Sequence, residues 1–561
     1  MPVKNIKKQN LFQLAVLAAI IICVNILSIY VFKRLDMTQE KRYTISNASI
    51  QLAKNLDDIV YFKIYLEGNL PPGFNRLKNS LKEMLDEFRI YSGDNIEYEF
   101  IDPSSNRDEK EKISLYRQLA GKGLIPTNLE QKDQSGQSQK IIFPGAIVSY
   151  HSREFPMQVL KSRMGSSPEE MLNNSIENLE YEINSMLRRI TTDRGLSVGF
   201  LQGQQELSTL HLSDANAALS DFYSVDSVTI DGKLNALKDF SCVIIAGPDT
   251  FFNEKDKFII DQYIMHGGKV FWLIDKMKIN MDSLSVSSTN VAVAKELNIE
   301  DMLFKYGVRI NPDLLLDLQA APIPIVTGYV GNQPKQQLFP WYYFPLLQTE
   351  SLHPIVHNLN AVKTEFVSSI DTIESENVNK TVLLTTGKFS RIQMAPARVS
   401  LNMLRDEPDA KLFNKHNIPV AILLEGNFSS NFTNRIPDQL LSSPDIDFKN
   451  KSVSTSMIVV SDADIISNYI SKKGNIYPLG YDRFTRLNYG NKNFILNCVD
   501  YLCGKKEILG LRGKELRLRL LDPSKIENSA GIQWLNLLAP AGLIILFGVF
   551  FNLIKKRRFE K

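Results

Sequence analysis

Polar side chains with the chemistry of a ligand site follow several apolar stretches of the sequence. They are Gln202 to Glu206, Asp249, Asp275, and the pair Asp462 and Asp464. Ligands in open α/β sheets bind beyond the carboxyl ends of the strands, so these residues are expected to line one cleft. Asp and Gly also cap helices and turn the chain at strand ends, which is the alternative. The candidate ligand-binding residues are Gln202, Glu206, Asp249, Asp275 and Asp462.

The sequence lacks the common catalytic motifs. No G-x-x-x-x-G-K-[ST] stretch is present to cradle the phosphates of ATP, and no G-x-S-x-G elbow is present to expose a nucleophilic serine. His353 and His357 have the spacing of two metal ligands on a helix, but Pro354 follows the first and no glutamate adjoins it, so we expect a surface loop. The sequence therefore predicts no catalytic residue, no metal and no cofactor.

The four cysteines do not form a disulfide framework. Cys23 lies in an apolar run near the first residue, and Cys242, Cys498 and Cys503 are left for the rest of the chain. The C-x4-C spacing of the last two is typical of neither a thioredoxin motif nor a zinc site. We expect plain buried thiols, because free cysteine packs as a small apolar side chain.

The elements near the first residues predict a thioredoxin-like domain over residues 40–190, without a CxxC motif. The expected elements are a strand at Ile59 to Leu66, a helix at Phe74 to Tyr91, a strand at Ile96 to Ile101, a helix near Lys112 to Ala120, a hairpin of Ala146 to Tyr150 with Phe155 to Leu160, and a helix at Met171 to Arg189. Without the two cysteines the redox chemistry of that fold is absent, and a binding or spacer module remains.

A second α/β domain, of the amidotransferase or flavodoxin-like kind, is predicted over residues 195–282 and 401–510. Its strands are expected at Leu196 to Leu201, Cys242 to Ala246, Gly268 to Ile274, Val420 to Leu424 and Met457 to Val460, with helices at Glu254 to Met265 and Asn491 to Cys503. Continuous apolar runs separated by helices predict parallel strands buried on both faces. The proline-rich residues 283–400 are interpreted as an elaborated insertion with antiparallel strands.

Two apolar stretches predict membrane-spanning helices, at residues 11–32 and 532–554. Each is long enough to cross a hydrocarbon core of about 30 Å. The first is longer than the apolar part of a cleaved signal peptide, which is the competing interpretation. The second begins near Trp534, contains Pro540, and ends at the basic residues of the tail. Its alternative is a buried core helix.

Charge predicts the orientation of these helices. The formal net charge is +3, with +3 at Lys4, Lys7 and Lys8, +4 in residues 555–561, and −4 in the remainder. Basic flanks stay in the cytoplasm, so residues 1–10 and 555–561 are expected to be cytoplasmic tails and the main body periplasmic, on the inner membrane. A mildly acidic body argues against nucleic acid as a partner.

Several segments resemble the GldG family, the gliding-motility-associated ABC transporter substrate-binding or auxiliary proteins of Bacteroidetes. They are RLDMTQEKRYTIS at residues 34–46, IEYEFIDP at 96–103, GQQE at 203–206, YPLGYDRFTRLNYGNKNFILNCVDYL at 477–502 and LRGKELRLRLLD at 511–522. Family members commonly carry GHGE where this chain has GQQE, so no role for that histidine follows here. The resemblance covers nearly the whole chain.

The resemblance implies an extracytoplasmic, membrane-anchored and non-enzymatic subunit that works with an ABC permease and a cytoplasmic ATPase, linked to gliding motility. The missing P-loop agrees with a separate ATPase subunit. Two other interpretations stay open. One is a structural scaffold of an envelope machine without a ligand, and the other is an unrecognised carbohydrate-active enzyme on an amidotransferase-like sheet.

Overall fold

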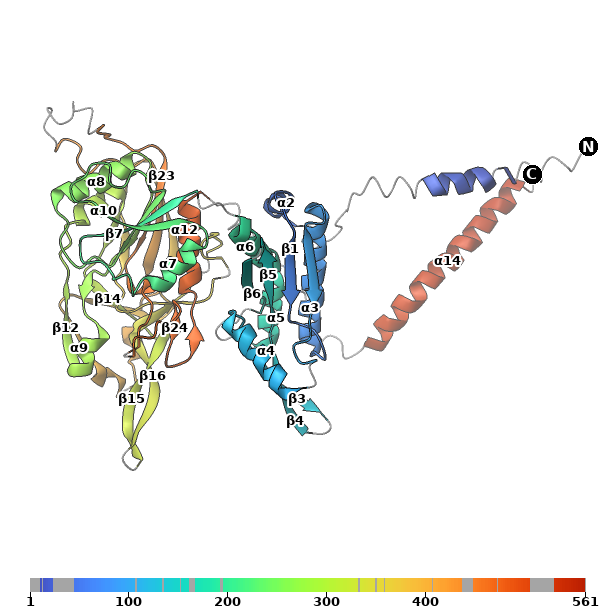
Figure 1. The fold of residues 1–561 in the computed structure, drawn as a ribbon, viewed down its shortest axis with the longest axis horizontal. Coiled ribbons are helices and arrows are strands. Elements are labelled where there is room, and N and C mark those ends of the chain that lie inside the picture. Colours follow the sequence, from blue (N-terminus) through green and yellow to red (C-terminus); the bar gives the residue numbers. More distant parts are fainter. Residues whose placement is uncertain are drawn as a thin grey trace, which may run out of the picture. The chain divides into compact units, whose positions relative to one another are not determined.

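The computed structural model is a mixed α/β protein, and this expected class is confirmed (Figure 1). The structure describes residues 11–12, 14–23, 45–105, 108–133, 136–151, 153–160, 167–191, 195–330, 333–348, 351–357, 359–405, 407–435, 447–471, 473–504 and 529–559. The chain divides into two compact units, Met1–Glu515 and Leu516–Lys561, and each is described by itself below.

A small mixed sheet forms the first part of the larger unit. Its strands are β1 (Val60–Ile64), β2 (Ile96–Phe100), β5 (Gly145–Tyr150) and β6 (Arg153–Gln158), in the order β2-β1-β5-β6. β1 is parallel to β2 and antiparallel to β5, which forms a hairpin with β6. The expected β-α-β unit and hairpin are present, and the thioredoxin-like name remains a prediction.

Helices and a second hairpin complete this part. They are α2 (Asn47–Lys54), α3 (Pro72–Tyr91), α4 (Glu109–Gly121), α5 (Pro168–Glu177) and α6 (Leu179–Thr191), with β3 (Thr127–Asp133) and β4 (Gly136–Ile142). Along α3, Phe74, Leu77, Leu81 and Phe88 recur on one helical face and are buried in a core shared with the sheet. α2 and the β3–β4 hairpin have no counterpart among the expected elements.

The single helix expected over residues 171–189 is wrong, because the structure has two helices there. α5 ends at Glu177 and α6 begins at Leu179. Asn178, between them, donates its side-chain N–H to the carbonyl oxygen of Asn174 at 2.7 Å. Such local side-chain bonds compete with regular helix geometry, which gives a physical reason for the break.

The largest sheet, as the described residues form it, has seven strands in the order β19-β22-β23-β10-β9-β7-β8. Their bounds are β7 (Ser197–Gln202), β8 (Ser224–Thr229), β9 (Cys242–Ala246), β10 (Val270–Leu273), β19 (Val378–Thr385), β22 (Pro419–Gly426) and β23 (Thr455–Val460). β7, β9, β10 and β23 are parallel, as their continuous apolar runs predict, and β8, which the sequence did not predict, pairs in parallel with β7 at the edge.

Two strands of this sheet correct the sequence expectations. β22 is antiparallel to both of its neighbours, β23 and β19. An apolar run indicates that a strand is buried on both faces, but it does not indicate whether the strand runs parallel or antiparallel to its neighbours. The antiparallel direction of β22 was therefore not predictable. β19 belongs to residues 283–400, which were interpreted as a separate insertion. It joins the sheet at an edge, where a half-buried strand lacks a continuous apolar run.

Helices cover both faces of the large sheet. One face, with Ile244 and Leu273, shares an apolar core with α7 (Ser213–Ser220) and α12 (Asn491–Leu502). The other face, with Ile245 and Trp272, shares a core with α8 (Glu254–Met265) and α10 (Glu300–Tyr306). Both faces of the central strands are therefore covered, and the polar loops lie at the ends of those strands.

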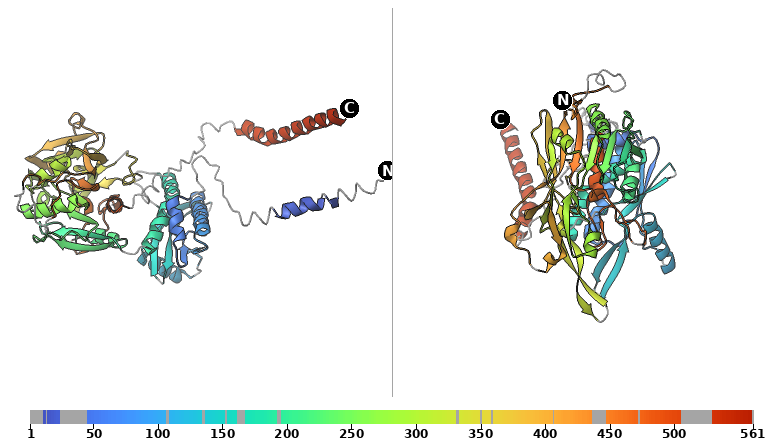
Figure 2. Two further views of the ribbon diagram at one scale, coloured as in Figure 1. Left: turned by 90° about the horizontal axis from the view of Figure 1, so that it is seen from above. Right: turned by 90° about the vertical axis from the view of Figure 1, so that its left-hand side faces the viewer.

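Residues 277–400 form mostly antiparallel pairs. They are β12 (Thr289–Ala294) with β11 (Met277–Lys278) and β21 (Ala397–Ser400), β13 (Val308–Ile310) with β18 (Ile370–Thr372), β14 (Asp313–Asp317) with β20 (Ser390–Met394), and β16 (Gln333–Leu347) with β15 (Ala320–Val330) and β17 (Val362–Lys363). The long β15–β16 hairpin extends away from the large sheet (Figures 1 and 2). Short elements complete the unit, namely α9 (Met281–Val286), η1 (Leu401–Leu404), η2 (Ala410–Leu412), η3 (Asp464–Ile466), β24 (Tyr481–Asp482) and β25 (Leu487–Asn488).

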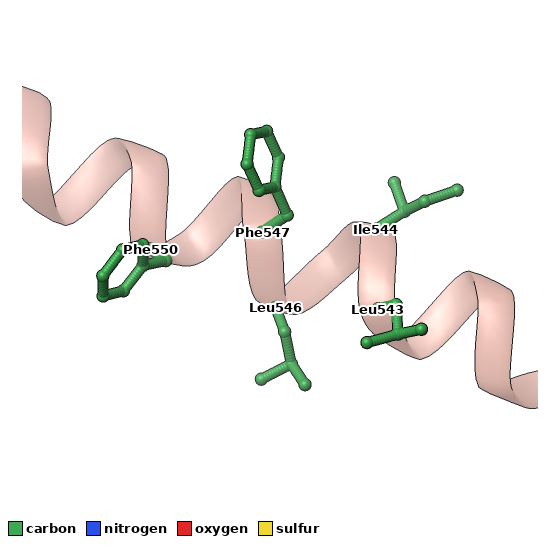
Figure 3. A pocket seen from close by; sticks show the side chains of 5 residues that line it. All are labelled: Leu543, Ile544, Leu546, Phe547 and Phe550. Atoms are coloured by element: carbon green, nitrogen blue, oxygen red, sulfur yellow. The ribbon is translucent and has the colours of Figure 1, made fainter.

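The second unit contains the helix α14 (Ser529–Phe559). Its stretch Leu537–Ile554 is long and apolar enough to cross a membrane, and it lies within the expected span. Figure 3 shows the side chains that line an open hollow on this helix, Leu543, Ile544, Leu546, Phe547 and Phe550. All of them come from one apolar helix, so we do not take the hollow as a ligand site.

The first expected span is only partly described. Leu14–Cys23 forms an apolar helix that is too short by itself to cross a membrane, and residues 24–32 lie outside the described residues. Among the residues that the structure describes, α14 is thus the one candidate span, and two spans remain a prediction.

Candidate functional site

The loop after β7 is closed by Glu206. Gly203 and Gln205 have positive φ angles of 137° and 55°, which turn the chain sharply after Gln202. The Glu206 carboxylate accepts the backbone N–H groups of Gly203 and Gln204 at 2.9 and 2.8 Å. Burial raises the pKa of Glu206, although hydrogen bonds from backbone N–H groups oppose the shift. Within the described part of the chain, its second oxygen has no hydrogen-bond donor.

This loop is joined to the loop after β9. The carbonyl oxygen of Gln204 accepts the backbone N–H groups of Asp249 and Thr250 at 2.9 and 3.1 Å. The Gln204 side chain donates to Asp256 at 3.0 Å, and Asp256 also accepts the amide of Asn253, which caps α8. The polar side chains of this loop therefore stabilise the fold of the sheet edge.

Lys295 connects the next two candidate carboxylates. Its ammonium group lies 2.9 Å from Asp249 and 3.9 Å from Asp275. Lys295 directly follows β12, and its backbone N–H donates to the carbonyl oxygen of Lys276. Asp275 also accepts the backbone N–H of Ala463 at 2.7 Å, which ties the loop after β10 to the loop after β23.

Asp462 is fully buried and holds two segments together. One carboxylate oxygen accepts the backbone N–H of Glu365 at 2.8 Å, and the other accepts that of Asp464 at 2.7 Å. Glu365 follows β17, so this bond joins the end of β23 to the 277–400 region. The Glu365 carboxylate in turn pairs with Lys363 at 3.0 Å.

Like charges gather at this edge. Burial raises the pKa of Asp275, and it raises the pKa values of Asp462 and Asp464 well above the ordinary range. Nearby carboxylates add to each shift, while the positive charge of Lys295 opposes the shifts of Asp275 and Asp464. Such shifts are typical of functional clefts and also of structural charge networks. Here Asp275 contacts a backbone N–H group and Lys295, and Asp462 accepts two backbone N–H groups.

The structure brings together three of the five candidate residues. Asp249, Asp275 and Asp462 meet because they follow the neighbouring strands β9, β10 and β23. Glu206 lies in the adjoining loop and faces Asp256, and Gln202 ends β7 opposite Thr229 of β8. Sequence reasoning missed Lys295, Lys363 and Glu365. No local motif marks these residues, because they come from a region distant in sequence.

The other reactive residues do not form a site at this edge. His353 and His357 lie in a turn, and His357 is only 7% exposed, so the expected surface loop is wrong for it. The thiols of Cys242 and Cys498 are free and buried, and burial raises both pKa values well above the usual range. The described ranges contain no group of three or more His, Cys, Asp or Glu residues placed to hold a metal ion.

Fold and site define a class of protein: a large α/β body with a candidate membrane span, whose polar sheet edge is engaged mainly in internal contacts. The chain belongs to the family described as ABC-type uncharacterized transport system, the auxiliary components of ABC transporters. The family model matches residues 196–498, which is more than half of the 561 residues and runs from β7 into α12. Residues 39–149 match a second family, described as a domain of unknown function.

Similar proteins add little on activity. An uncharacterized protein of Borreliella burgdorferi is 22% identical over 539 residues, covering 93% of each chain. Among solved structures, the mmIFT52 N-terminal domain is 13% identical with a TM-score of 0.31, covering 55% of this chain and 97% of that one, a likeness too weak to carry an argument. The resemblance to an auxiliary family of ABC transporters is thus confirmed, and membership in GldG itself remains a prediction.

Proposed function

We propose that the protein is a membrane-anchored, non-enzymatic subunit of an ABC-type transport complex. The family match over residues 196–498 carries this proposal. Two further features support it. The sequence has no P-loop, so ATP hydrolysis must come from another subunit, and α14 provides a candidate membrane anchor. The partners are a polytopic permease and a cytoplasmic ATPase.

The proposed topology places both termini in the cytoplasm and the body outside it, on the inner membrane of a diderm cell. Lys555, Lys556, Arg557 and Arg558 follow the apolar part of α14, and basic flanks stay on the cytoplasmic side. A span over residues 11–32 would return the chain to the same side. The link to gliding motility rests on the sequence resemblance alone.

A structural role of the body is favoured by one observation at the sheet edge. Asp462 and Asp275 accept backbone N–H groups from other segments, and Asp249 pairs with Lys295. Carboxylates engaged in this way hold the loops of the body in place and leave little capacity for a ligand or for acid–base catalysis. The body is therefore proposed to brace the complex or transmit its motion, in preference to carbohydrate chemistry.

Purification of the tagged full chain from membranes in mild detergent, with identification of the co-purified proteins by mass spectrometry, tests the proposal. We expect a permease and an ATPase in constant ratio to the chain. A chain that ends at residue 528 should lose them, and a Phe547→Leu/Phe550→Leu variant, which keeps α14 apolar, should retain them. Recovery of neither partner with the full chain would contradict the proposal.

A further inference from the structure

A cluster of aromatic side chains lies in the loop between η3 and α12, and two of its rings belong to the 477–502 segment, which the proposed function does not use. The rings of Tyr469 and Tyr477 are 5.6 Å apart, and those of Tyr477 and Tyr481 are stacked at 5.1 Å with an angle of 8° between them. All three rings are partly exposed. Stacking fixes their positions, so together they offer a rigid amphipathic surface.

Arg483 extends this surface with an oriented cation. Its guanidinium carbon lies 4.4 Å from the ring centre of Tyr469 and 4.5 Å from that of Phe484, and it also donates to the Tyr469 hydroxyl. The residue is exposed. Contact with two rings orients the planar guanidinium and leaves further N–H donors for an oxyanion, which arginine binds in a bidentate manner.

The charge of this surface is positive. Arg486 is exposed in the same turn, between β24 and β25. Asp482 is buried, and its carboxylate accepts the backbone N–H of Phe484 and the hydroxyl of Thr485. Among the described residues, no acidic side chain pairs with either arginine. A cationic surface of this kind attracts anions.

Two exposed apolar residues adjoin these groups: Ile476 precedes Tyr477, and Leu487 pairs with Asp482 across β24 and β25. Ile476 is 45% exposed and Leu487 is 38% exposed. Tyrosine, arginine and exposed aliphatic side chains occur together at membrane interfaces, where the rings sit at the level of the headgroups and the cations meet anionic lipid. We name residues 469–471 and 473–488 the aromatic–basic surface.

We propose that the aromatic–basic surface docks on the anionic phospholipid headgroups of the membrane that α14 spans. This inference rests on the membrane anchoring in the proposed function, but not on assembly with a transporter. Residues 503–528, between α12 and α14, can span at most roughly 94 Å. The anchor therefore limits how far the surface can lie from lipid and raises its effective concentration there, so that weak contacts suffice.

Hydrogen exchange of the full chain in lipid nanodiscs tests this proposal. Discs of anionic phosphatidylglycerol are compared with discs of zwitterionic phosphatidylcholine, and a third sample adds inorganic phosphate to the zwitterionic discs. We expect the amides of residues 469–488 to exchange several-fold more slowly in anionic discs only. Arg483→Ala/Arg486→Ala should remove this difference in exchange rate. Each arginine close to an anionic membrane raises the affinity for that membrane about fivefold.

A matched variant, Arg309→Ala/Arg398→Ala, removes two exposed arginines elsewhere and should behave as the unchanged chain. Unaltered exchange in the strands of the large sheet verifies that each variant folds. Equal exchange in both lipids, protection by phosphate alone, or protection that persists in the Arg483/Arg486 variant would each overturn the proposal. Loss of co-purified partners in that variant, with no lipid effect, would instead identify a protein-binding surface. If the unchanged chain fails to co-purify a permease and an ATPase, that result contradicts the proposed function and leaves the lipid proposal standing.

Discussion

A buried ion pair joins the small sheet's core to the large sheet, and removing it should be costly. Arg188 of α6 binds Asp500 of α12 through two bonds of 2.7 and 2.8 Å, and the two side chains are 5% and 8% exposed. Tyr223 donates to the same carboxylate at 2.5 Å, and the guanidinium lies 4.7 Å from the Phe222 ring. Burial and the Asp500 charge raise the pKa of Tyr223, so the tyrosine stays a donor.

Arg188→Ala leaves the Asp500 carboxylate buried without a cation. Such a loss typically costs about 3–5 kcal/mol, and we expect the lower end because Tyr223 still donates. Arg189 offers a matched control on the next residue. Its pair with Asp221 is 27% and 33% exposed, so Arg189→Ala should cost at most about 1 kcal/mol.

Urea unfolding of the full chain in mild detergent, followed by the fluorescence of the buried Trp272 and Trp341, measures both variants. The double variant Arg188→Met/Asp500→Leu removes both charges and should recover most of the loss, because apolar pairs often replace buried ion pairs without cost. If Arg188→Ala and Arg189→Ala lower the free energy of unfolding equally, the assigned role of the pair is refuted.

Two further predictions concern the sheet edge. Burial raises the pKa of Asp464 well above its usual range, so the stability that its protonated form contributes is present below the ordinary value of about 4 and is lost as pH rises through the raised pKa. Asp464→Asn should raise stability at pH 8 by about 1 kcal/mol and flatten the decline in stability that begins above the ordinary pKa. Asp226→Asn, at an exposed residue of β8, should do neither. Parallel urea-unfolding profiles for all three proteins would contradict this prediction. Glu206→Ala leaves the N–H groups of Gly203 and Gln204 without an acceptor and should cost about 2 kcal/mol, with faster hydrogen exchange at both amides, while Glu206→Gln retains an acceptor oxygen. Equal exchange in the two Glu206 variants would count against that assignment.

The sequence predicted best the strands that are buried on both faces. β9, β10 and β23 are buried throughout, and each contains a continuous apolar run, which is the pattern that predicts a strand covered on both faces. β8 and β19 lie at the edges of the sheet and mix polar with apolar residues, so no run marks them. The break at Asn178 coincides with a local side-chain bond to the backbone, which periodicity does not reveal.

The part of the candidate site that was predictable is the meeting of residues at the ends of neighbouring parallel strands. Asp249, Asp275 and Asp462 follow three adjacent strands, and their meeting follows from the parallel topology alone. The partners that contact these three carboxylates, Lys295 and Glu365, come from a region whose strand pairing the sequence does not encode locally. For that reason the internal contacts of these carboxylates were not predictable, and ligand binding at this edge remains a prediction.

ATP hydrolysis by material purified through a tag on this chain tests the central proposal most directly. The sequence has no P-loop, so the proposal assigns ATP hydrolysis to a bound partner. We expect the detergent-extracted full chain to carry vanadate-sensitive ATPase activity, and the chain that ends at residue 528 to carry none. Activity no higher than that of the chain produced alone, in a host without the partner subunits, would contradict a role in an ABC-type transport complex.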